Sequence, residues 1–327
     1  MVEQHRNPEN NEGKEEVGGS GLKHIGEILS RGQERPDGRS SGTTRESHQM
    51  KETKTEDCVC QSCGQTFRGE VTIFYYTNPP REFRNTECPK CREARESEEK
   101  IIEDQELELR RILVRERWKR ECGIPWGLQC TRFEDFEPEY ERKPLRACLK
   151  WAENINIENP KGTPSLLLFS EVPGVGKTTL MACIANYIIN NWHGDPDQAR
   201  CPIRFESGPG LVRRIRATYN IPDDDAHLER EEQVYNQLRG VNLLMLDDVG
   251  KEQPHSNRFT QEVYWYINDE RVKASLPMVI SSRLEMTGPG SLEELMTADA
   301  VDRLYGMCRG QIVTLGGNSY RRSHNIP

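Results

Sequence analysis

The chain has 327 residues, of which 34% are hydrophobic and 30% are charged. That length suits one large domain plus a small one, or two domains, and the low hydrophobic share places part of the chain outside any packed core. The formal net charge of −8 excludes a general attraction to nucleic acid, so a DNA contact requires a local basic patch. No apolar stretch approaches a membrane span, and the first residues lack the apolar run of a signal peptide, so we expect a cytoplasmic protein with no membrane contact.

Residues 1–56 are rich in Gly, Ser, Glu, Arg and Asn and poor in apolar residues. Such a segment buries too little surface to offset its ordering entropy, so we predict a disordered tail. One apolar group interrupts it, GLKHIGEIL at residues 21–29, whose apolar residues share one helical face. It is either a short helix that docks on a partner or a chance cluster.

Residues 57–92 hold two C-x₂-C pairs around an aromatic, strand-like run, VTIFYY. Eleven cysteines in a chain expected in the cytosol favour metal binding over disulfides. Four thiolates with no open position make a structural Zn²⁺ site, and so small a module needs the metal because its own core is small. Cys58 is a fifth candidate that could replace Cys60 at a less usual spacing. The predicted zinc ligands are Cys60, Cys63, Cys88 and Cys91.

Residues 93–121 form a dense run of charges without Pro or Gly. Ile102, Leu109 and Leu113 recur in it at helical intervals, which predicts a solvated linker helix. Gly123 then ends the helix.

From residue 122 to the C-terminus, apolar strand-like runs alternate with amphipathic helical patterns. Strands separated by helices imply an α/β fold with a parallel sheet covered on both faces. The predicted strands cover 164–169, 202–207, 241–248 and 277–282, and the predicted helices cover 177–192, 210–219 and 257–273.

The first of these strands leads into SEVPGVGKTTL, which resembles a phosphate-binding loop except that Glu171 replaces its first glycine. Two glycines let the backbone N–H groups turn toward phosphate, Lys177 reaches the β- and γ-phosphates, and Thr178 binds Mg²⁺. Glu171 lies at the strand exit, where its side chain can point outward, so we expect nucleotide binding to survive. The predicted nucleotide-binding residues are Pro173, Gly174, Val175, Gly176, Lys177, Thr178 and Thr179.

The run LLMLDD ends a later strand with Asp247 and Asp248. An apolar strand that ends in two acids fits the second half of an NTPase site. Asp247 would hold Mg²⁺ through water, and Asp248 would polarise the attacking water. Taken alone, the run also fits an ordinary strand that ends in an acidic turn.

The helical sequence LVRRIRATY places Arg213, Arg214 and Arg216 opposite its apolar face. Three arginines there could follow the phosphates of single-stranded DNA. The alternative is a solvated basic face, balanced by the acidic run DDDAHLEREE downstream.

Five segments in order, CGIPWGLQCTRFEDF, VPGVGKTTL, LLMLDDVG, INDERVKASLPMVISSR and AVDRLYG with GGNSYR, resemble the DnaC/DnaI-type helicase loaders. These are AAA+ ATPases related to the IstB transposition helpers, and the resemblance covers residues 122–323. It implies an AAA+ P-loop NTPase domain over residues 122–327 that binds ATP and Mg²⁺ and self-associates. Its trans-acting arginine falls on Arg303, which would complete a neighbour's ATP site, and its C-terminal SYR arginine falls on Arg321.

Two positions depart from that pattern: Glu171, and Arg283 at the end of the fourth strand, where a polar sensor, usually asparagine, orients the hydrolytic water. Arginine there puts the rate of hydrolysis in question more than nucleotide binding, and slow turnover would suit a switch. The small zinc-ribbon module at residues 57–92 could bind DNA or protein. Some loaders carry an N-terminal zinc module that binds the helicase, so the resemblance favours protein binding.

The leading hypothesis is an ATP-hydrolysing protein that loads a replicative ring helicase onto single-stranded DNA. A transposition helper of the IstB type is the alternative within the same fold. A nucleotide-dependent adaptor that does not hydrolyse ATP is the alternative from another class.

Overall fold

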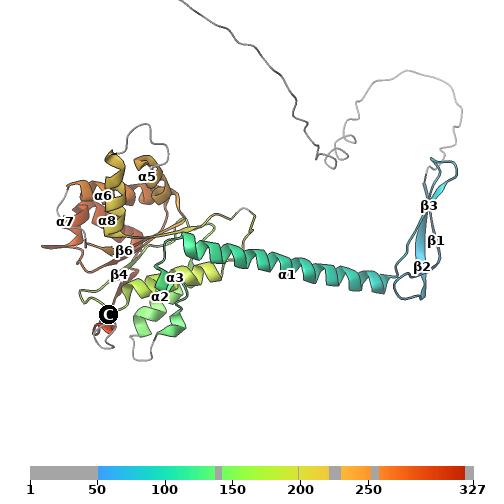
Figure 1. The fold of residues 1–327 in the computed structure, drawn as a ribbon, viewed down its shortest axis with the longest axis horizontal. Helices are drawn as coiled ribbons and strands as arrows, with labels where there is room; N and C mark the ends of the chain where they lie inside the picture. Colours follow the sequence, from blue (N-terminus) through green and yellow to red (C-terminus); the bar gives the residue numbers. More distant parts are fainter. Residues whose placement is uncertain (1–50, 137–141, 198, 221–229, 252–257, 321–327) are drawn as a thin grey trace, which may run out of the picture. The chain divides into compact units, whose positions relative to one another are not determined.

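A computed structural model describes residues 51–136, 142–197, 199–220, 230–251 and 258–320. The chain divides into two compact units, residues 1–88 and 89–327. The smaller unit holds a three-stranded sheet and the larger one a five-stranded sheet with helices (Figure 1). Within the described ranges, no helix is both long enough and apolar enough to cross a membrane.

The smaller unit is an antiparallel meander of β1 (Lys51–Val59), β2 (Thr66–Phe74) and β3 (Arg81–Arg84). Cys58, Val71 and Ile73 form its apolar core. Strand β1 begins inside the segment predicted to be disordered, so that prediction is wrong for residues 51–56. The strand is mostly exposed and is held by backbone hydrogen bonds to β2. The prediction of disorder considered only how much apolar surface the segment can bury, so it did not detect this pairing. The rest of the predicted tail, including the apolar group at residues 21–29, lies outside the described residues.

Helix α1 (Pro89–Glu121) spans the predicted linker helix and starts four residues earlier. One face of its last turns is buried, at Val114, Arg115 and Trp118. Trp118 is 1% exposed and its ring lies 4.6 Å from that of Trp192, centroid to centroid. Beside it, Arg115 Nε donates to the carbonyl of Trp192 at 2.9 Å. The C-terminal end of α1 is therefore part of the core of the larger unit.

The larger unit contains a fully parallel sheet in the order β5-β6-β7-β4-β8. Four of its strands match the predicted ones, and β8 was not predicted because three residues give too short a pattern. The arrangement is the predicted α/β type, a parallel sheet flanked by helices. The strands are β4 (Leu166–Phe169), β5 (Ile203–Ser207), β6 (Leu243–Val249), β7 (Met278–Ser282) and β8 (Ile312–Thr314).

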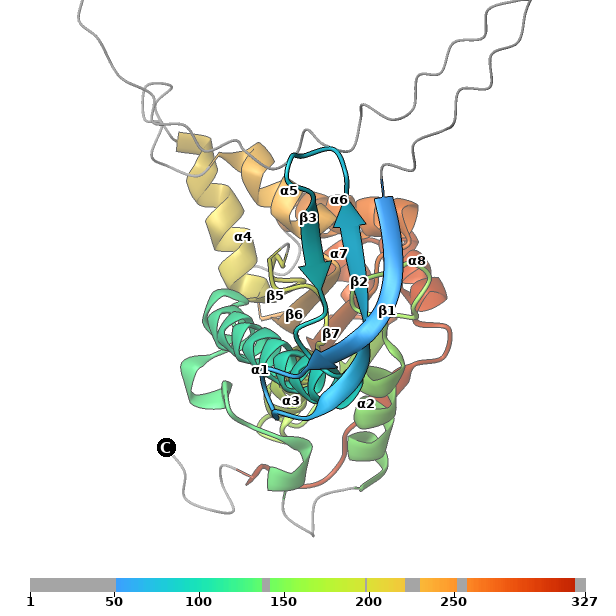
Figure 2. The same ribbon diagram turned by 90° about the vertical axis from the view of Figure 1, so that its right-hand side faces the viewer.

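Helices cover both faces of this sheet, with α2 and α3 on one side and α5 to α8 on the other (Figures 1 and 2). Successive strand residues alternate between the two cores, as the period of a strand requires. Leu166 and Leu168 of β4 pack on the α3 side, whereas Leu167 packs on the α6 side. The helices are α2 (Arg142–Asn154), α3 (Lys177–Asn190), α4 (Gly208–Ala217), α5 (Glu231–Gly240), α6 (Arg258–Ala274), α7 (Leu292–Met296) and α8 (Ala298–Cys308), with short 3₁₀ turns at Trp126–Leu128, Phe133–Asp135 and Thr218–Asn220.

Arg271 of α6 is fully buried and donates only to backbone carbonyls among its described contacts. The acceptors belong to Leu238 at 2.8 Å, Val241 at 2.9 Å, Asn242 at 3.3 Å and Pro277 at 2.7 Å. Burial lowers the pKa of Arg271 to about 9. The guanidinium ties the end of α5 and the start of β7 to α6, and so fixes how β6 and β7 enter the sheet.

Replacing Trp118 by Ala tests whether α1 belongs to the core. Removing this ring leaves a cavity against Trp192, so we expect the free energy of unfolding in urea to fall by about 3–5 kcal/mol. Leu113→Ala is the matched control because Leu113 lies on the same helix and is 63% exposed. It should change the free energy by no more than about 0.5 kcal/mol. Equal losses in the two variants would contradict this packing.

Candidate nucleotide and metal sites

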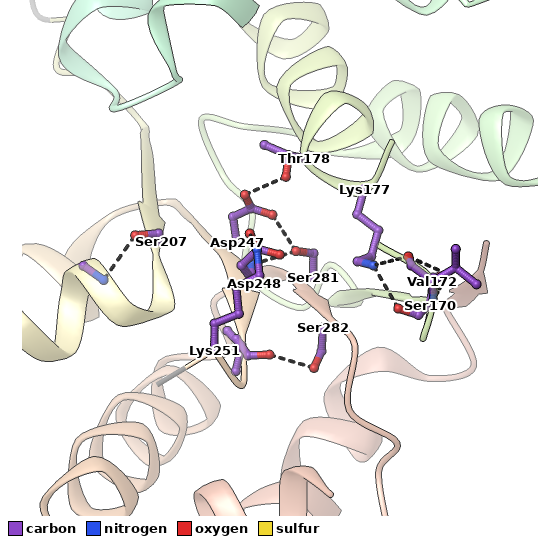
Figure 3. A network of polar contacts seen from close by, with 12 residues as sticks. Ser170, Val172, Lys177, Thr178, Ser207, Asp247, Asp248, Lys251, Ser281 and Ser282 are labelled. Atoms are coloured by element: carbon purple, nitrogen blue, oxygen red, sulfur yellow. Dashed lines mark hydrogen bonds and ion pairs between the residues drawn. The ribbon is translucent and has the colours of Figure 1, made fainter. Parts of the chain in front are cut away.

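The carboxyl ends of β4, β6 and β7 meet at one edge of the sheet, where the chain gathers its chemically active side chains (Figure 3). Parallel strands bring distant segments to the same edge, and ligands of open α/β sheets bind there. Lys177 and Thr178 begin α3, Asp247 lies near the end of β6, and Ser281 lies near the end of β7.

The loop between β4 and α3 has the backbone conformation that the motif predicts. Gly174 has φ +80° and Gly176 has φ +92°, values that side chains disfavour. A Cβ on Gly174 would lie 2.4 Å from Ser319 Oγ, so this glycine is also required for space. Gly176 caps α3 without any side-chain hydrogen bond. Because the first N–H groups of a helix have no intrahelical acceptor, this end of α3 suits an anion.

Lys177 is 5% exposed and its ammonium lies over the loop. Its Nζ donates to the carbonyl of Ser170 at 2.9 Å (Figure 3). Burial lowers the pKa of Lys177 to about 8; the carboxylates of Asp248 and Asp247 oppose this shift, and the charge of Arg283 adds to it. A buried ammonium held by neutral carbonyls gains more from an anionic partner than an exposed one does.

Asp247 is the centre of the polar network in Figure 3 and is 6% exposed. Thr178 Oγ1 donates to its Oδ2 at 2.8 Å, and Ser281 Oγ donates to its Oδ1 at 2.5 Å. Burial raises the pKa of Asp247, and the two hydrogen bonds act against that rise. The structure thus brings together the threonine and the aspartate predicted to serve one magnesium ion, and oxygen ligands of this kind suit Mg²⁺.

Asp248 follows with a left-handed backbone, φ 55°, which is unusual for a residue other than glycine. Its backbone N–H donates to Ser281 Oγ at 2.9 Å, and its carboxylate pairs with Lys251. Ser281 therefore contacts both aspartates.

Sequence reasoning missed both Ser281 and Lys251. The available signal for the serine was the polar pair Ser281–Ser282, which ends an otherwise apolar, buried strand. Arg283, the residue predicted at the sensor position, is exposed and lies two residues beyond the hydroxyl that contacts Asp247. Glu171 is also exposed, as its expected outward direction requires.

The four cysteines predicted to bind zinc lie together, with all four sulfurs within 4.8 Å of one another. A tetrahedral zinc ion with Zn–S bonds of about 2.3 Å separates its sulfur ligands by about 3.8 Å. The Sγ atoms of Cys63 and Cys88 are 3.9 Å apart. The N–H of Cys88 donates to Cys60 Sγ at 3.3 Å and lowers the pKa of Cys60 to about 6. Cys58 instead packs in the apolar core with Val71, which removes it as an alternative ligand. The donor set fits a structural zinc ion.

Comparison with known proteins supports the resemblance predicted from the motifs. No family model matches the chain. The replicative helicase loader DnaC of Buchnera aphidicola subsp. Baizongia pistaciae is 27% identical over 228 residues, 69% of this chain and 81% of that protein. DnaC of Buchnera aphidicola subsp. Schizaphis graminum is 26% identical over 210 residues, 64% and 74% of the two chains. The chain is similar to the DnaC-type helicase loaders.

Solved structures of loaders are similar to part of this chain at low sequence identity. The crystal structure of the DnaC helicase loader has a TM-score of 0.44 and 18% identity, over 58% of this chain and 98% of that chain. The crystal structure of DnaI has a TM-score of 0.42 and 20% identity, over 61% and 95%.

Of the two arginines predicted by the DnaC resemblance, Arg303 has its described ion pairs outside the P-loop network. Arg303 of α8 pairs with Asp269 of α6, and with Asp299 of its own helix at 3.2 Å. Lys273 also reaches Asp269, at 2.6 Å. Arg321 lies outside the described residues.

The arginines predicted to contact DNA all lie on α4, in different surroundings. Arg213 is exposed. Arg216 is exposed too, and its guanidinium carbon lies 5.0 Å from the centroid of Phe259. Arg214 is half-buried and pairs with Glu206 of β5. A phosphate backbone can therefore reach Arg213 and Arg216 more readily than Arg214.

Metal analysis of the purified protein tests the cysteine site. We expect one zinc ion per chain, retained against a weak chelator, and loss of that ion in Cys63→Ser because three thiolates leave the tetrahedron incomplete. Cys58→Ser is the control and should keep the ion, since Cys58 faces the apolar core. Metal loss from both variants would show that Cys58 takes part in binding.

Proposed function

We propose that this protein is an ATP-dependent loader that delivers a replicative ring helicase onto single-stranded DNA. The observation that carries the proposal is the hydrogen bond from Thr178 to Asp247 at the start of the P-loop helix, whose N-cap glycine makes no side-chain hydrogen bond. It joins the two halves of an NTPase site in a chain that is similar to DnaC over most of the length of that loader.

Each residue at the sheet edge has a proposed task toward ATP and Mg²⁺. The N-terminus of α3 and Lys177 bind the phosphates, while Thr178 and Asp247 hold the metal. Bound Mg²⁺ supplies charge neutralisation between the phosphates. Asp248 orients the attacking water, and to do so it must give up its ion pair with Lys251. Slow hydrolysis is proposed from Arg283 at the sensor position, and it would suit a timed release of the loader.

Arg303 is proposed to act on the ATP of a neighbouring subunit, where a guanidinium stabilises charge on the transferring phosphoryl group. In the single chain it pairs with Asp269, so it must leave this carboxylate to reach a neighbour. Lys273 lies 2.6 Å from the same carboxylate and keeps it neutralised after Arg303 departs. This arrangement supports self-association through the ATPase domains.

The zinc module is proposed to bind the helicase. Its β2–β3 region exposes aromatic rings, with Tyr76 61% exposed and Phe83 57% exposed. Both rings pack on Phe74, at 5.3 Å and 5.5 Å between centroids. Rigid, exposed aromatic rings are typical of protein-binding surfaces.

Helicase loading onto single-stranded DNA coated with its binding protein tests the proposal, with unwinding of a downstream duplex followed by fluorescence. We expect wild type to start unwinding, and both Lys177→Ala and a chain lacking residues 1–92 to fail. The first variant loses phosphate binding, and the second loses the helicase contact. Lys150→Ala is the matched control, because this exposed lysine lies on α2, outside the nucleotide site.

Unwinding by Lys177→Ala at the wild-type rate would make nucleotide use incidental and favour the adaptor function. No stimulation by wild type would contradict the loader function and favour a transposition helper.

Mixing two inactive variants tests the role of Arg303. Lys177→Ala and Arg303→Ala should each lack ATPase activity, and their mixture should regain part of it. In mixed assemblies, the Lys177→Ala subunit supplies its arginine to the intact P-loop of its neighbour. A mixture as inactive as its components would contradict action in trans.

The pH dependence of ATP binding tests the state of Lys177. Its pKa is lowered to about 8 in the free protein, so above pH 8 the neutral amine must take up a proton when phosphate binds. We expect the affinity for Mg-ATP to be constant up to about pH 8 and then to fall by up to about tenfold per pH unit. Lys177→Arg, measured by the same titration calorimetry, should show no such fall because a guanidinium stays charged. Identical pH profiles would place the titrating group elsewhere.

A further inference from the structure

A cavity of about 470 Å³ lies among the 3₁₀ turn Thr218–Asn220, α5 and α6. It shares no residue with the P-loop network. The nucleotide site and the proposed loading function leave it without a role. Its volume falls in the range of ligand-binding clefts, about 300–1,000 Å³. Aromatic side chains make up much of its lining: Tyr219, Tyr235, Phe259, Trp265 and Tyr266.

These rings come in pairs that hold each other in place. Tyr219 meets Phe259 edge to face with centroids 5.5 Å apart, and Tyr235 meets Tyr266 at 4.7 Å. Tyr219 also donates its hydroxyl to Glu231 at 2.9 Å. Burial raises the pKa of Tyr235, which keeps its hydroxyl neutral. Four of the five rings are therefore held by a neighbouring ring, and Trp265 lies exposed in the same lining.

Carboxylates predominate among the charged groups that line the cavity. Three glutamates, Glu231, Glu232 and Glu262, line it together with one arginine, Arg239. Arg239 lies 4.0 Å from Glu270, outside the lining. Arg258 pairs with Glu262 at 2.8 Å, but both groups are well exposed, and such surface pairs are weak.

The cavity also has a guanidinium stacked on one of its rings. Arg216 of α4 lies over Phe259, with 5.0 Å from its guanidinium carbon to the ring centroid. Aromatic faces attract cations, and a planar guanidinium can stack on a ring while it donates hydrogen bonds to carboxylates.

We propose that this aromatic and acidic cavity binds an arginine side chain presented by a peptide segment of a protein partner. The guanidinium lies against Trp265 and pairs with Glu262, both of which are exposed on α6. Rings of this kind also stack on nucleobases, and Arg216 beside the cavity attracts phosphates. The three glutamates of the lining nevertheless outnumber its one arginine, which favours a cationic occupant. The inference is independent of the proposed loading function, since binding at this cavity requires neither ATP nor a helicase.

Fluorescence anisotropy of a rhodamine-labelled peptide, acetyl-Gly-Arg-Gly-Arg-Gly amide, tests the proposal on the full-length zinc-loaded protein at 150 mM salt. The matched probe carries citrulline in place of both arginines, which keeps the shape and removes the charge. We expect the citrulline peptide to bind at least about tenfold more weakly. Glu262→Gln and Trp265→Leu should each weaken binding of the arginine peptide about fivefold or more.

Glu153→Gln is the control variant, because Glu153 is an exposed carboxylate on α2, outside the cavity lining. It should leave binding unchanged, and all three variants should melt at the wild-type temperature. Equal binding of the citrulline peptide, equal loss in Glu153→Gln, or unchanged binding in the two cavity variants would each overturn the proposal. Displacement of the peptide by a single-stranded oligonucleotide whose own binding needs Trp265 would overturn it in favour of a nucleobase site.

Discussion

The buried carboxylate of Asp247 is the constraint on which the arrangement of the sheet edge depends. A carboxylate that is 6% exposed destabilises the fold unless its oxygens receive hydrogen bonds, and Thr178 and Ser281 provide them. These two donors belong to α3 and β7, while Asp247 belongs to β6. One side chain thus fixes three elements relative to one another. A metal bound beside Thr178 would change the contacts of Asp247 and so affect both β6 and β7.

Structural features far from that edge keep its elements in register. Arg271 binds the carbonyls that precede β6 and β7 and so sets where both strands begin. On the other face of the sheet, Trp118 and Trp192 fasten the end of α1 to the α3 side of the core. Because protein interiors are close-packed, small shifts at the edge are resisted by both supports. The candidate nucleotide site is therefore held firmly at the P-loop, and the partly exposed ion pair of Asp248 with Lys251 is the contact that can change.

Sequence alone predicted those features that follow from local pattern. Continuous apolar runs predicted the strands β4, β6 and β7. The motif that ends in Lys177–Thr178 predicted the phosphate-binding loop, and the cysteine spacing predicted the zinc ligands. The contact of Ser281 with Asp247 was not predictable in this way, since it depends on the pairing of β6 with β7, which shifts register between Leu246 and Val249. The same holds for β1, where backbone pairing replaces burial. The aromatic cavity was missed because its rings come from three separate segments.

The pairing of Arg303 with Asp269 gives the proposed finger two competing partners. An arginine that floated free in solution would lose conformational entropy on reaching a neighbour's phosphate. Arg303 is already held by Asp269 and Asp299, so its transfer exchanges one set of charge contacts for another. Lys273 remains on Asp269 after the exchange, and no buried carboxylate is left without a cation. The choice of Arg303 between Asp269 and ATP would depend on the charge of the phosphates bound to the neighbouring subunit. The proposed finger would therefore engage ATP and return to Asp269 once the terminal phosphate has gone.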